Sequence, residues 1–262
     1  MDTAQEIDAI ALREGYNSRQ RILQLAGITV FFGWTPYILL RCLALTEPLG
    51  GTQALFATTM GVVAGYLFAD ASSGVVHWLG DNYGREDWPV IGPAFIRPFR
   101  HHHILPKDIC EHGFVQLNGN NCLVTLPVFW IATLPSTDPN RAFESVFFGF
   151  FCISLCWFVF ATNQLHAWAH SDNPPPFARR LQRMGLALSP EHHDLHHQPP
   201  HNKAYCITSG VMDNPLRLIR FFPALEFVLK RLTGSEPMHQ SIGAEASSPE
   251  DSSPASNHSS TS

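Results

Sequence analysis

Four largely apolar runs divide the first two thirds of the chain, at about residues 22–40, 50–78, 122–136 and 144–168, and apart from Asp70 and Glu144 they are uncharged. A helix needs about 20 apolar residues to cross the hydrocarbon core of a membrane. The first, second and fourth runs meet that length. The third is short and contains Pro127, so it is either a tilted or partial span or a buried, re-entrant segment. The pattern predicts an all-α integral membrane protein with about four transmembrane helices.

The distribution of Lys and Arg sets the expected orientation of these spans, because basic residues concentrate on the cytosolic side of a membrane. Residues 1–21 contain three Arg, and the segments 80–111 and 173–231 hold most of the other basic residues. The two remaining loops, 46–53 and 136–143, together hold one. We therefore expect a multi-pass protein of a bacterial inner membrane or the endoplasmic reticulum, with both termini cytosolic.

The C-terminal half has the pattern of a cytosolic helical cap, residues 173–232, followed by a polar tail. Within the cap, residues 177–188 and 215–232 mix apolar and basic positions at helical spacing. This favours helices that lie on the inner leaflet, although core-facing helices of a soluble cap have a similar pattern. Residues 233–262 are rich in Ser and Pro and predict a disordered tail. The expected domain organisation is a cytosolic segment 1–21, a membrane domain 22–232 and this tail.

Composition contributes one anomaly, which is the 14 His in a chain of 262 residues. The net charge of −5 and the absence of a basic motif argue against nucleic-acid binding. The six Cys form no CxxC motif, and we expect them to be packing residues in a reducing compartment. The first residues are polar and acidic, unlike a signal peptide.

Two histidine clusters lie at the cytosolic ends of predicted spans. His77 and Asp81 are one turn apart beyond the second span. Asp70 lies two turns before His77 on the same helical face, where it is a candidate to orient a ligand. His166 and His170, at i and i+4, present both imidazoles from the end of the fourth span.

Two further clusters lie outside the spans. Residues 101–103 are three consecutive histidines, of which a regular element can direct at most two toward one place, one for each of two metals. In SPEHHDLHH, Ser189 suits the N-cap of a short helix, and His192 falls off its main histidine face. The histidines on that face are His193, His196 and His197.

The topology brings all four clusters to one membrane face. One histidine at a membrane boundary is more often a hydrogen-bonded residue than a ligand. Crowded imidazoles, however, would repel one another on protonation, whereas a metal binds their neutral form. The candidate ligands are His77, Asp81, His102, His103, His166, His170, His193, His196 and His197. That number exceeds the four ligands of a tetrahedral zinc and suits two metals, although imidazole alone does not select iron.

The ordered motifs HWLGDNYG, FIRPFRHHH, EHGFVQLNGNNCL, NQLHAWAH, SPEHHDLHH and YCITSGVMDNPL, within residues 62–237, resemble the plasmanylethanolamine desaturase family. This family includes the bacterial CarF proteins and is related to the plant phosphatidylglycerol trans-desaturases. The resemblance implies a membrane lipid desaturase with two Fe ions, O2 as co-substrate and an external cytochrome b5-like or ferredoxin-like electron donor. The implied reaction converts the 1-O-alkyl chain of a plasmanyl ethanolamine phospholipid into the vinyl ether of a plasmalogen.

The resemblance also extends to single residues. The family's histidine pair is matched by His102 and His103, which leaves His101 as an extra residue. His112 and His201 are similar to positions of the plasmalogen-forming branch and not of the plant branch, which favours the ether-lipid substrate. Positions expected near the metals, without an assignment as ligands, are Asp70, His112, Asn118, Asn121, His192, Asp194 and His201.

Three rival interpretations stay open at this point. A hydroxylase or an acyl-lipid desaturase would share the metal set and the first chemical step. A zinc-dependent membrane enzyme is another rival, whereas a metal transporter would carry polar ligands at mid-membrane, where the long spans are uncharged. A non-catalytic adaptor would have no use for eight converging imidazoles.

Overall fold

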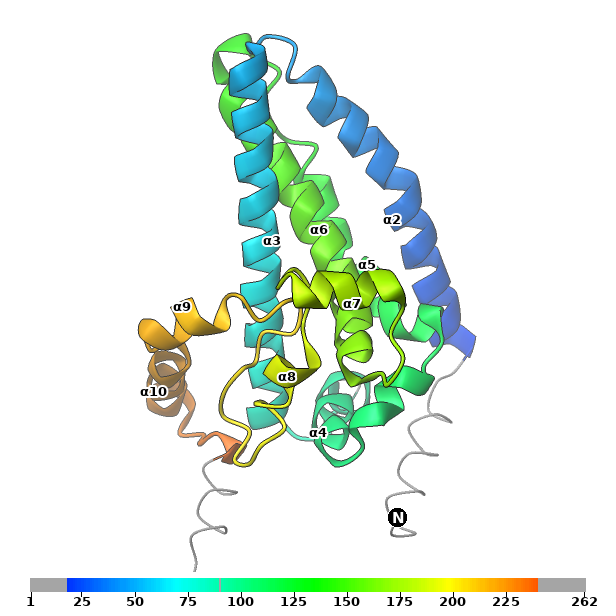
Figure 1. Cartoon of the computed structure of the whole chain (residues 1–262), viewed down its shortest axis with the longest axis vertical. Coiled ribbons are helices and arrows are strands. Elements are labelled where there is room, and N and C mark those ends of the chain that lie inside the picture. The colour runs from blue at the N-terminus through cyan, green and yellow to red at the C-terminus, as the bar shows by residue number, and fades with distance from the viewer. Residues whose placement is uncertain (1–17, 90, 240–262) are drawn as a thin grey trace, which may run out of the picture.

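The structure is a computed structural model that describes residues 18–89 and 91–239, and these residues form helices and no strand. Four helices form an elongated bundle, with most of the shorter helices gathered around one end of it (Figure 1). The bundle helices are α2 (Ser18–Ala44), α3 (Gly51–Asn82), α5 (Phe114–Ile131) and α6 (Ala142–His170). The shorter helices are η1 (Gly92–Ile96), α4 (Arg97–Ile104), η2 (Pro106–Glu111), η3 (Pro139–Arg141), α7 (Pro176–Arg183), α8 (Pro190–His193), α9 (Asp213–Leu218) and α10 (Phe221–Thr233).

Three of the predicted spans are confirmed as helices that are long and apolar enough to cross a membrane: Ser18–Ala44, Gly51–Asn82 and Pro139–His170. The third predicted span, 122–136, is wrong in its bounds, because α5 begins at Phe114 and ends at Ile131. Its polar first half is stabilised by neighbouring helices, as when Asn121 Nδ2 donates to the carbonyl oxygen of Val159 on α6 at 2.8 Å. Residues 132–138 continue from α5 to the end of the bundle where α2 ends, and there Arg41 Nη2 donates to Pro135 O at 2.8 Å.

Small residues on α3 set its close approach to α6. A Cβ atom at Gly61 would lie 2.4 Å from the carbonyl oxygen of Phe147, and one at Gly65 would lie 2.4 Å from that of Phe151. Glycines four residues apart form one groove along a helix, which lets a second backbone pack directly against it. The close contact therefore holds α3 and α6, the two longest helices, side by side. Both helices carry candidate ligands at the same end of the bundle.

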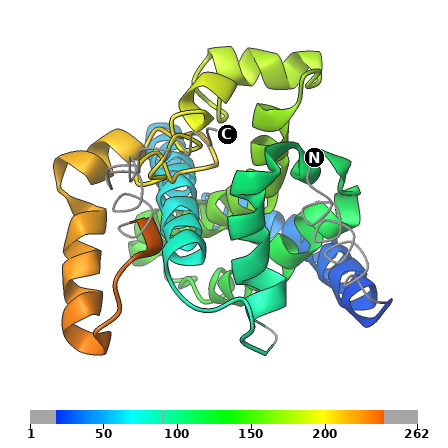
Figure 2. The same cartoon turned by 90° about the horizontal axis from the view of Figure 1, so that it is seen from below.

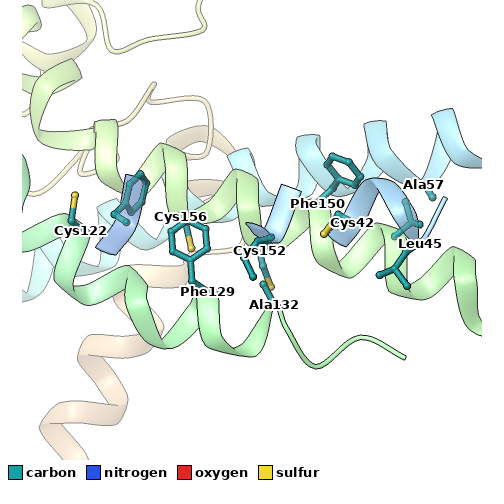
Figure 3. Close-up of a cluster of buried hydrophobic side chains, with 12 residues drawn as sticks. Cys42, Leu45, Ala57, Cys122, Phe129, Ala132, Phe150, Cys152 and Cys156 are labelled. Atoms are coloured by element: carbon teal, nitrogen blue, oxygen red, sulfur yellow. The ribbon is translucent and has the colours of Figure 1, made fainter. Parts of the chain in front are cut away.

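The core of the bundle combines aromatic rings with cysteines (Figure 3). Phe31 packs edge-on against Phe129 and Trp157, with ring centroids 5.1 and 5.2 Å apart. All six cysteines are free, and five are buried, which fits the predicted packing role. Cys110 is exposed on η2 and differs from that prediction.

The cap covers the end of the bundle opposite the α2–α3 turn. Seen from below, α9 and α10 lie on one side of α3 and α4 lies on the other (Figure 2). The single amphipathic helix expected over 215–232 is wrong, because Arg220 has a left-handed φ of 53° that separates α9 from α10. Residues up to 239 are described beyond α10, and the backbone N–H of His239 donates to Asn82 Oδ1 at 3.2 Å. The rest of the predicted tail, and residues 1–17, lie outside the described residues.

Candidate metal centre

Four elements bring the nine candidate ligands together. The last two turns of α3 carry His77 and Asp81, and the last two turns of α6 carry His166 and His170. The last turn of α4 carries His102 and His103. The remaining three, His193, His196 and His197, come from α8 and the turn that follows it. The helix predicted to present His193, His196 and His197 on one face is wrong in its length, because α8 ends at His193. Its predicted N-cap is confirmed, because Ser189 Oγ accepts from the backbone N–H of His192 at 3.2 Å.

The ligand atoms separate into two adjacent groups, and within each group they lie within 4.8 Å of one another. Site A consists of His102, His170, His193 and His197. Site B consists of His77, Asp81, His103 and His196. His166 borders site A, because its Nε2 lies 2.8 Å from Nε2 of His193. The neighbours His102 and His103 fall in different sites, which matches the division expected of consecutive residues on a helix.

Distances within the sites are those of ligands that share a metal ion. In site A, Nε2 of His170 lies 2.9 Å from Nε2 of His102, and Nε2 of His197 lies 3.1 Å from Nε2 of His193. In site B, Nε2 of His196 lies 3.0 Å from Nε2 of His103. Two ligand atoms about 2.1 Å from one metal lie about 3 Å apart at a right angle and about 3.4 Å apart at the tetrahedral angle. The spacing of these imidazole pairs therefore fits ligands at about a right angle on a shared metal ion.

Backbone carbonyls select the nitrogen that faces site B. The Nδ1–H of His77 donates to the carbonyl oxygen of Tyr205 at 3.0 Å, and the Nδ1–H of His196 donates to that of Lys203 at 2.9 Å. A carbonyl oxygen only accepts, so Nδ1 carries the proton in both rings and Nε2 presents a lone pair. Such outer hydrogen bonds are typical of metal-binding histidines, because they fix the ring and its tautomer.

The contents of site B require a cation. Nε2 of His77 and both carboxylate oxygens of Asp81 are buried without a hydrogen-bond partner. The oxygens of Asp81 lie 3.3–3.5 Å from Nε2 of His77, His103 and His196. A buried carboxylate that faces imidazole lone pairs is unfavourable unless a positive charge lies between them. The residues present therefore fit a bound metal ion.

Four candidate ligands outside the spans have a lowered pKa. Burial, together with neighbouring imidazoles, lowers the pKa of His103 to about 2 and that of His197 to about 3. The same causes hold the pKa of His102 and of His193 well below the usual value. Because a metal binds the neutral imidazole, no proton must be removed from these ligands at neutral pH.

Asp70 has a different contact from the one expected of it. Its carboxylate accepts hydrogen bonds from the backbone N–H groups of Ser209, Gly210 and Met212, at 2.6, 3.1 and 2.9 Å. It therefore holds the loop 205–212 against α3 and makes no direct bond to a candidate ligand. The loop in turn supplies the Tyr205 carbonyl that orients His77.

The other expected neighbours divide by location. His201 lies against site B, where its Nδ1–H donates to the carbonyl oxygen of His196 at 3.0 Å and its ring centroid is 4.4 Å from that of His103. His192 points away from site A and bonds Asp213 at 2.7 Å, and this hydrogen bond raises the pKa of His192. Asp194 is exposed and belongs to neither site.

Three more of these residues, and His101, lie outside both sites. His112 Nε2 is 3.5 Å from Asp108 on the short helix η2. Asn118 Nδ2 donates within α5 to Phe114 O at 3.1 Å, and Asn121 joins α5 to α6 as described above. His101 is buried, and its Nε2 has no hydrogen-bond partner.

The carbonyl groups of Lys203 and Tyr205 could not be predicted as part of the site. These groups act through the backbone, so no side-chain pattern could identify them. The motif YCITSGVMDNPL was the only signal that this loop belongs to the site.

Comparison with known proteins gives the family. A lipid desaturase domain matches residues 66–240. The chain is 44% identical over 240 residues to the plasmanylethanolamine desaturase of Myxococcus xanthus, covering 91% of this chain and 82% of the relative. It is 37% identical to plasmanylethanolamine desaturase 1 of Mus musculus, covering 89% of this chain and 86% of the relative. The chloroplastic fatty acid desaturase 4 of Arabidopsis thaliana is 40% identical over 177 residues, covering 66% of this chain and 52% of the relative.

No solved structure matches the chain. The domain match covers more than half of the sequence, and two relatives match over most of both chains. Three helices are long and apolar enough to cross a membrane. The chain therefore belongs to the lipid desaturase family of membrane oxidoreductases.

Proposed function

We propose that this protein is an O2-dependent di-iron desaturase that converts the 1-O-alkyl chain of a plasmanyl ethanolamine phospholipid into the 1-O-alk-1'-enyl vinyl ether of a plasmalogen. The observation that carries the proposal is the pair of adjacent four-ligand groups at one end of an apolar bundle. The names of the relatives in Myxococcus and mouse support the ether-lipid substrate.

The nine candidate ligands have separate tasks in this proposal. Site A, with His166 beside it, would hold one iron ion and site B the other. Bound iron would supply the oxidising power to remove two hydrogen atoms from an unactivated carbon chain, using one O2, two electrons and two protons and releasing two waters. The electrons come from an external cytochrome b5-like or ferredoxin-like donor.

The chain's own residues prepare the site for this chemistry. His77, His193 and His196 are fully buried, so water is excluded from the inner part of both sites. The carbonyls of Tyr205 and Lys203 hold two imidazoles in their ligating orientation. Asp81 supplies the single negative charge of the two groups, which distinguishes site B from the all-imidazole site A.

In the proposed orientation, the termini and the metal centre face the cytosol, in a bacterial inner membrane or the endoplasmic reticulum. Support comes from the Lys and Arg of the cap and connecting segments. The α9–α10 pair adds to it, because Leu218 and Leu232 are 73% and 77% exposed beside Arg217 and Arg231. An apolar face flanked by basic residues suits the inner leaflet.

The test is ether-lipid mass spectrometry on a plasmalogen-null host that expresses the chain, its His193→Ala variant or its His101→Ala variant. We expect acid-labile vinyl-ether lipid from the native chain and none from His193→Ala. His101→Ala is the matched control, because this buried histidine of α4 lies in neither site, and it should retain product at normal protein level.

A folded, iron-loaded native chain that is supplied with plasmanyl lipid and an electron donor, and yet forms no vinyl ether, would refute the ether-lipid assignment. Lipid analysis would then be directed to a new double bond or hydroxyl in an acyl chain, the alternative that the match to fatty acid desaturase 4 favours. Zinc in place of iron in the purified protein, or full function of His193→Ala, would point to a zinc-dependent protein or an adaptor.

A further inference from the structure

A polar cavity of about 310 Å³ lies on the opposite side of α8 from the metal centre. It opens between α7, α8 and the start of α9, and its lining includes Gln182, Ser189, His192, Ser209 and Asn214. None of these residues belongs to site A or site B. The cavity therefore requires an explanation of its own.

Gln182 lines this cavity and has an unused donor. Its side chain is buried, with an exposed fraction of 8%, and its Nε2 has no hydrogen-bond partner. A buried amide donor without a partner is unfavourable, so Gln182 indicates a bound acceptor. Ser189 adds to this, because its Oγ accepts from the backbone of His192 and its hydroxyl hydrogen remains to be donated.

The acidic group closest to the cavity is already neutralised. Asp213 Oδ2 accepts from His192 Nε2 at 2.7 Å, and Asp213 Oδ1 accepts from the backbone N–H of Cys206 at 3.1 Å. Arg217 is the positive charge next to a lining residue, because its guanidinium donates to Asn214 Oδ1 at 3.4 Å. Amide and hydroxyl donors beside an arginine, without a free carboxylate, suit a phosphate ester.

The surroundings of the cavity are those of a membrane interface. Val211, which lines the cavity, is 44% exposed, and Met184 and Leu186, on either side of the lining residue Gly185, are 59% and 44% exposed. In Figure 1, α7 and α9 lie at a level along the bundle that is closer to the α2–α3 turn than the level of α8. Apolar side chains around a polar hollow at this level match the boundary between acyl chains and headgroups.

We propose that this cavity binds the phosphate group of the phospholipid substrate and so places the carbons next to its glycerol at the metal centre. The inference rests on the proposed function, in which the reacting carbons are separated from the headgroup by only a few bonds. Because α8 carries both His192, which lines the cavity, and His193 of site A, headgroup and reacting carbons reach neighbouring residues.

Gly210 keeps this cavity open. Its φ is +79°, and a Cβ atom there would lie 2.4 Å from Cδ2 of His192. Any larger residue would both strain the backbone and displace the imidazole. The loop is held in this conformation by the carboxylate of Asp70, which accepts from the Gly210 N–H.

The test uses the purified full-length chain and two variants that remove amide groups, Gln182→Leu and Asn214→Leu. Native mass spectrometry measures the affinity for dihexanoyl-phosphatidylethanolamine, and for dihexanoylglycerol and inorganic phosphate as separate probes. Gln53→Leu is the matched control, because Gln53 is exposed at the far end of α3. Thermal unfolding accompanies each measurement, and Gln182→Leu should not lower the midpoint, since its Nε2 makes no bond in the protein.

We expect each variant to raise the Kd for dihexanoyl-phosphatidylethanolamine about tenfold, the effect of losing one hydrogen bond to a charged group. KM for the desaturation should rise by the same factor while kcat stays unchanged. The phosphate-free dihexanoylglycerol should bind the native chain and the variants equally.

Unchanged lipid affinity in both variants overturns the cavity assignment, and so does inorganic phosphate that binds as tightly as the lipid. Vinyl-ether formation with an unchanged KM in both variants would also overturn it, while leaving the proposed function intact. Weakened phospholipid binding in a chain that forms no vinyl ether supports the cavity and refutes the ether-lipid function instead.

Discussion

At the residue scale, one carboxylate distinguishes the two halves of the metal centre. Site A contains only imidazoles, and Asp81 is the single acid of site B. Both of its oxygens are buried without a hydrogen-bond partner and lie 3.3–3.5 Å from three imidazole nitrogens. The negative charge of Asp81 partly compensates the positive charge of a bound metal ion, which neutral imidazoles do not.

Asp81→Asn should therefore weaken metal binding at site B more than at site A. We expect iron bound per chain to fall from about two to about one, with loss of desaturase product, because the amide is neutral and a poorer ligand for iron. Inductively coupled plasma mass spectrometry on purified protein measures this ratio. Asp194→Asn, at an exposed position outside both sites, is the control, and full iron content in Asp81→Asn would contradict the assignment.

At the element scale, the close contact between α3 and α6 gives the metal centre a rigid base. The two helices carry His77, Asp81, His166 and His170 in their last turns, so a change in their separation changes both sites. Glycines on α3 set that separation. The histidines of α8 have no such rigid support, and a loop held by Asp70 takes its place.

Gly65→Ala is expected to destabilise the bundle, because its Cβ would lie 2.4 Å from the carbonyl oxygen of Phe151 on α6. Overpacking of this kind costs about 1–3 kcal/mol. Thermal unfolding in detergent would show the loss as a lower midpoint. Gly33→Ala, where no neighbouring atom lies within 4 Å, makes the same change in α2 and should cause no loss. Equal midpoints for the two variants would argue against the close helix contact.

At the scale of the whole molecule, the metal centre joins segments that are distant in the chain. Its candidate ligands extend from His77 to His197 and come from two long helices, α4 and the cap. A bound metal would join ligands of the cap to ligands of the bundle, in addition to the hydrogen bonds between them. Metal binding and cap stability are therefore coupled.

Metal removal should therefore loosen the cap before the bundle. After chelation, we expect faster hydrogen exchange in residues 190–205 and a lower unfolding midpoint, with little change in the outer halves of α3 and α6. Hydrogen-exchange mass spectrometry before and after iron reloading measures the effect. Exchange that is identical with and without metal would show that these residues do not hold it.

The proposed orientation can be tested with a native cysteine. Cys110 is exposed on η2, and the other five cysteines are buried. A membrane-impermeant maleimide should label Cys110 in inside-out vesicles and leave intact cells unlabelled. Thr137→Cys, at an exposed position in the loop before η3, should show the opposite pattern. Labelling of Cys110 in intact cells would contradict the proposed orientation and indicate the opposite one.

The sequence by itself determined the long helices and the location of the histidines. Length and apolarity are local properties, so three spans could be predicted to within a few residues. The spacing of His166 and His170, and the N-cap at Ser189, also depend only on neighbours in the chain. The course of α5 could not be predicted, because contacts with α2 and α6 compensate for its polar first half.

Only the tertiary structure decided how the histidines divide between two sites and which ring nitrogen faces a metal. The division depends on the relative positions of four elements, and the ring orientation depends on carbonyls of Lys203 and Tyr205 that no side-chain pattern reveals. The task of Asp70 and the unsatisfied amide of Gln182 likewise became visible only with the cap packed on α3. The physical reason is that metal geometry and burial depend on distances in space, whereas helix length and histidine spacing depend on distance along the chain.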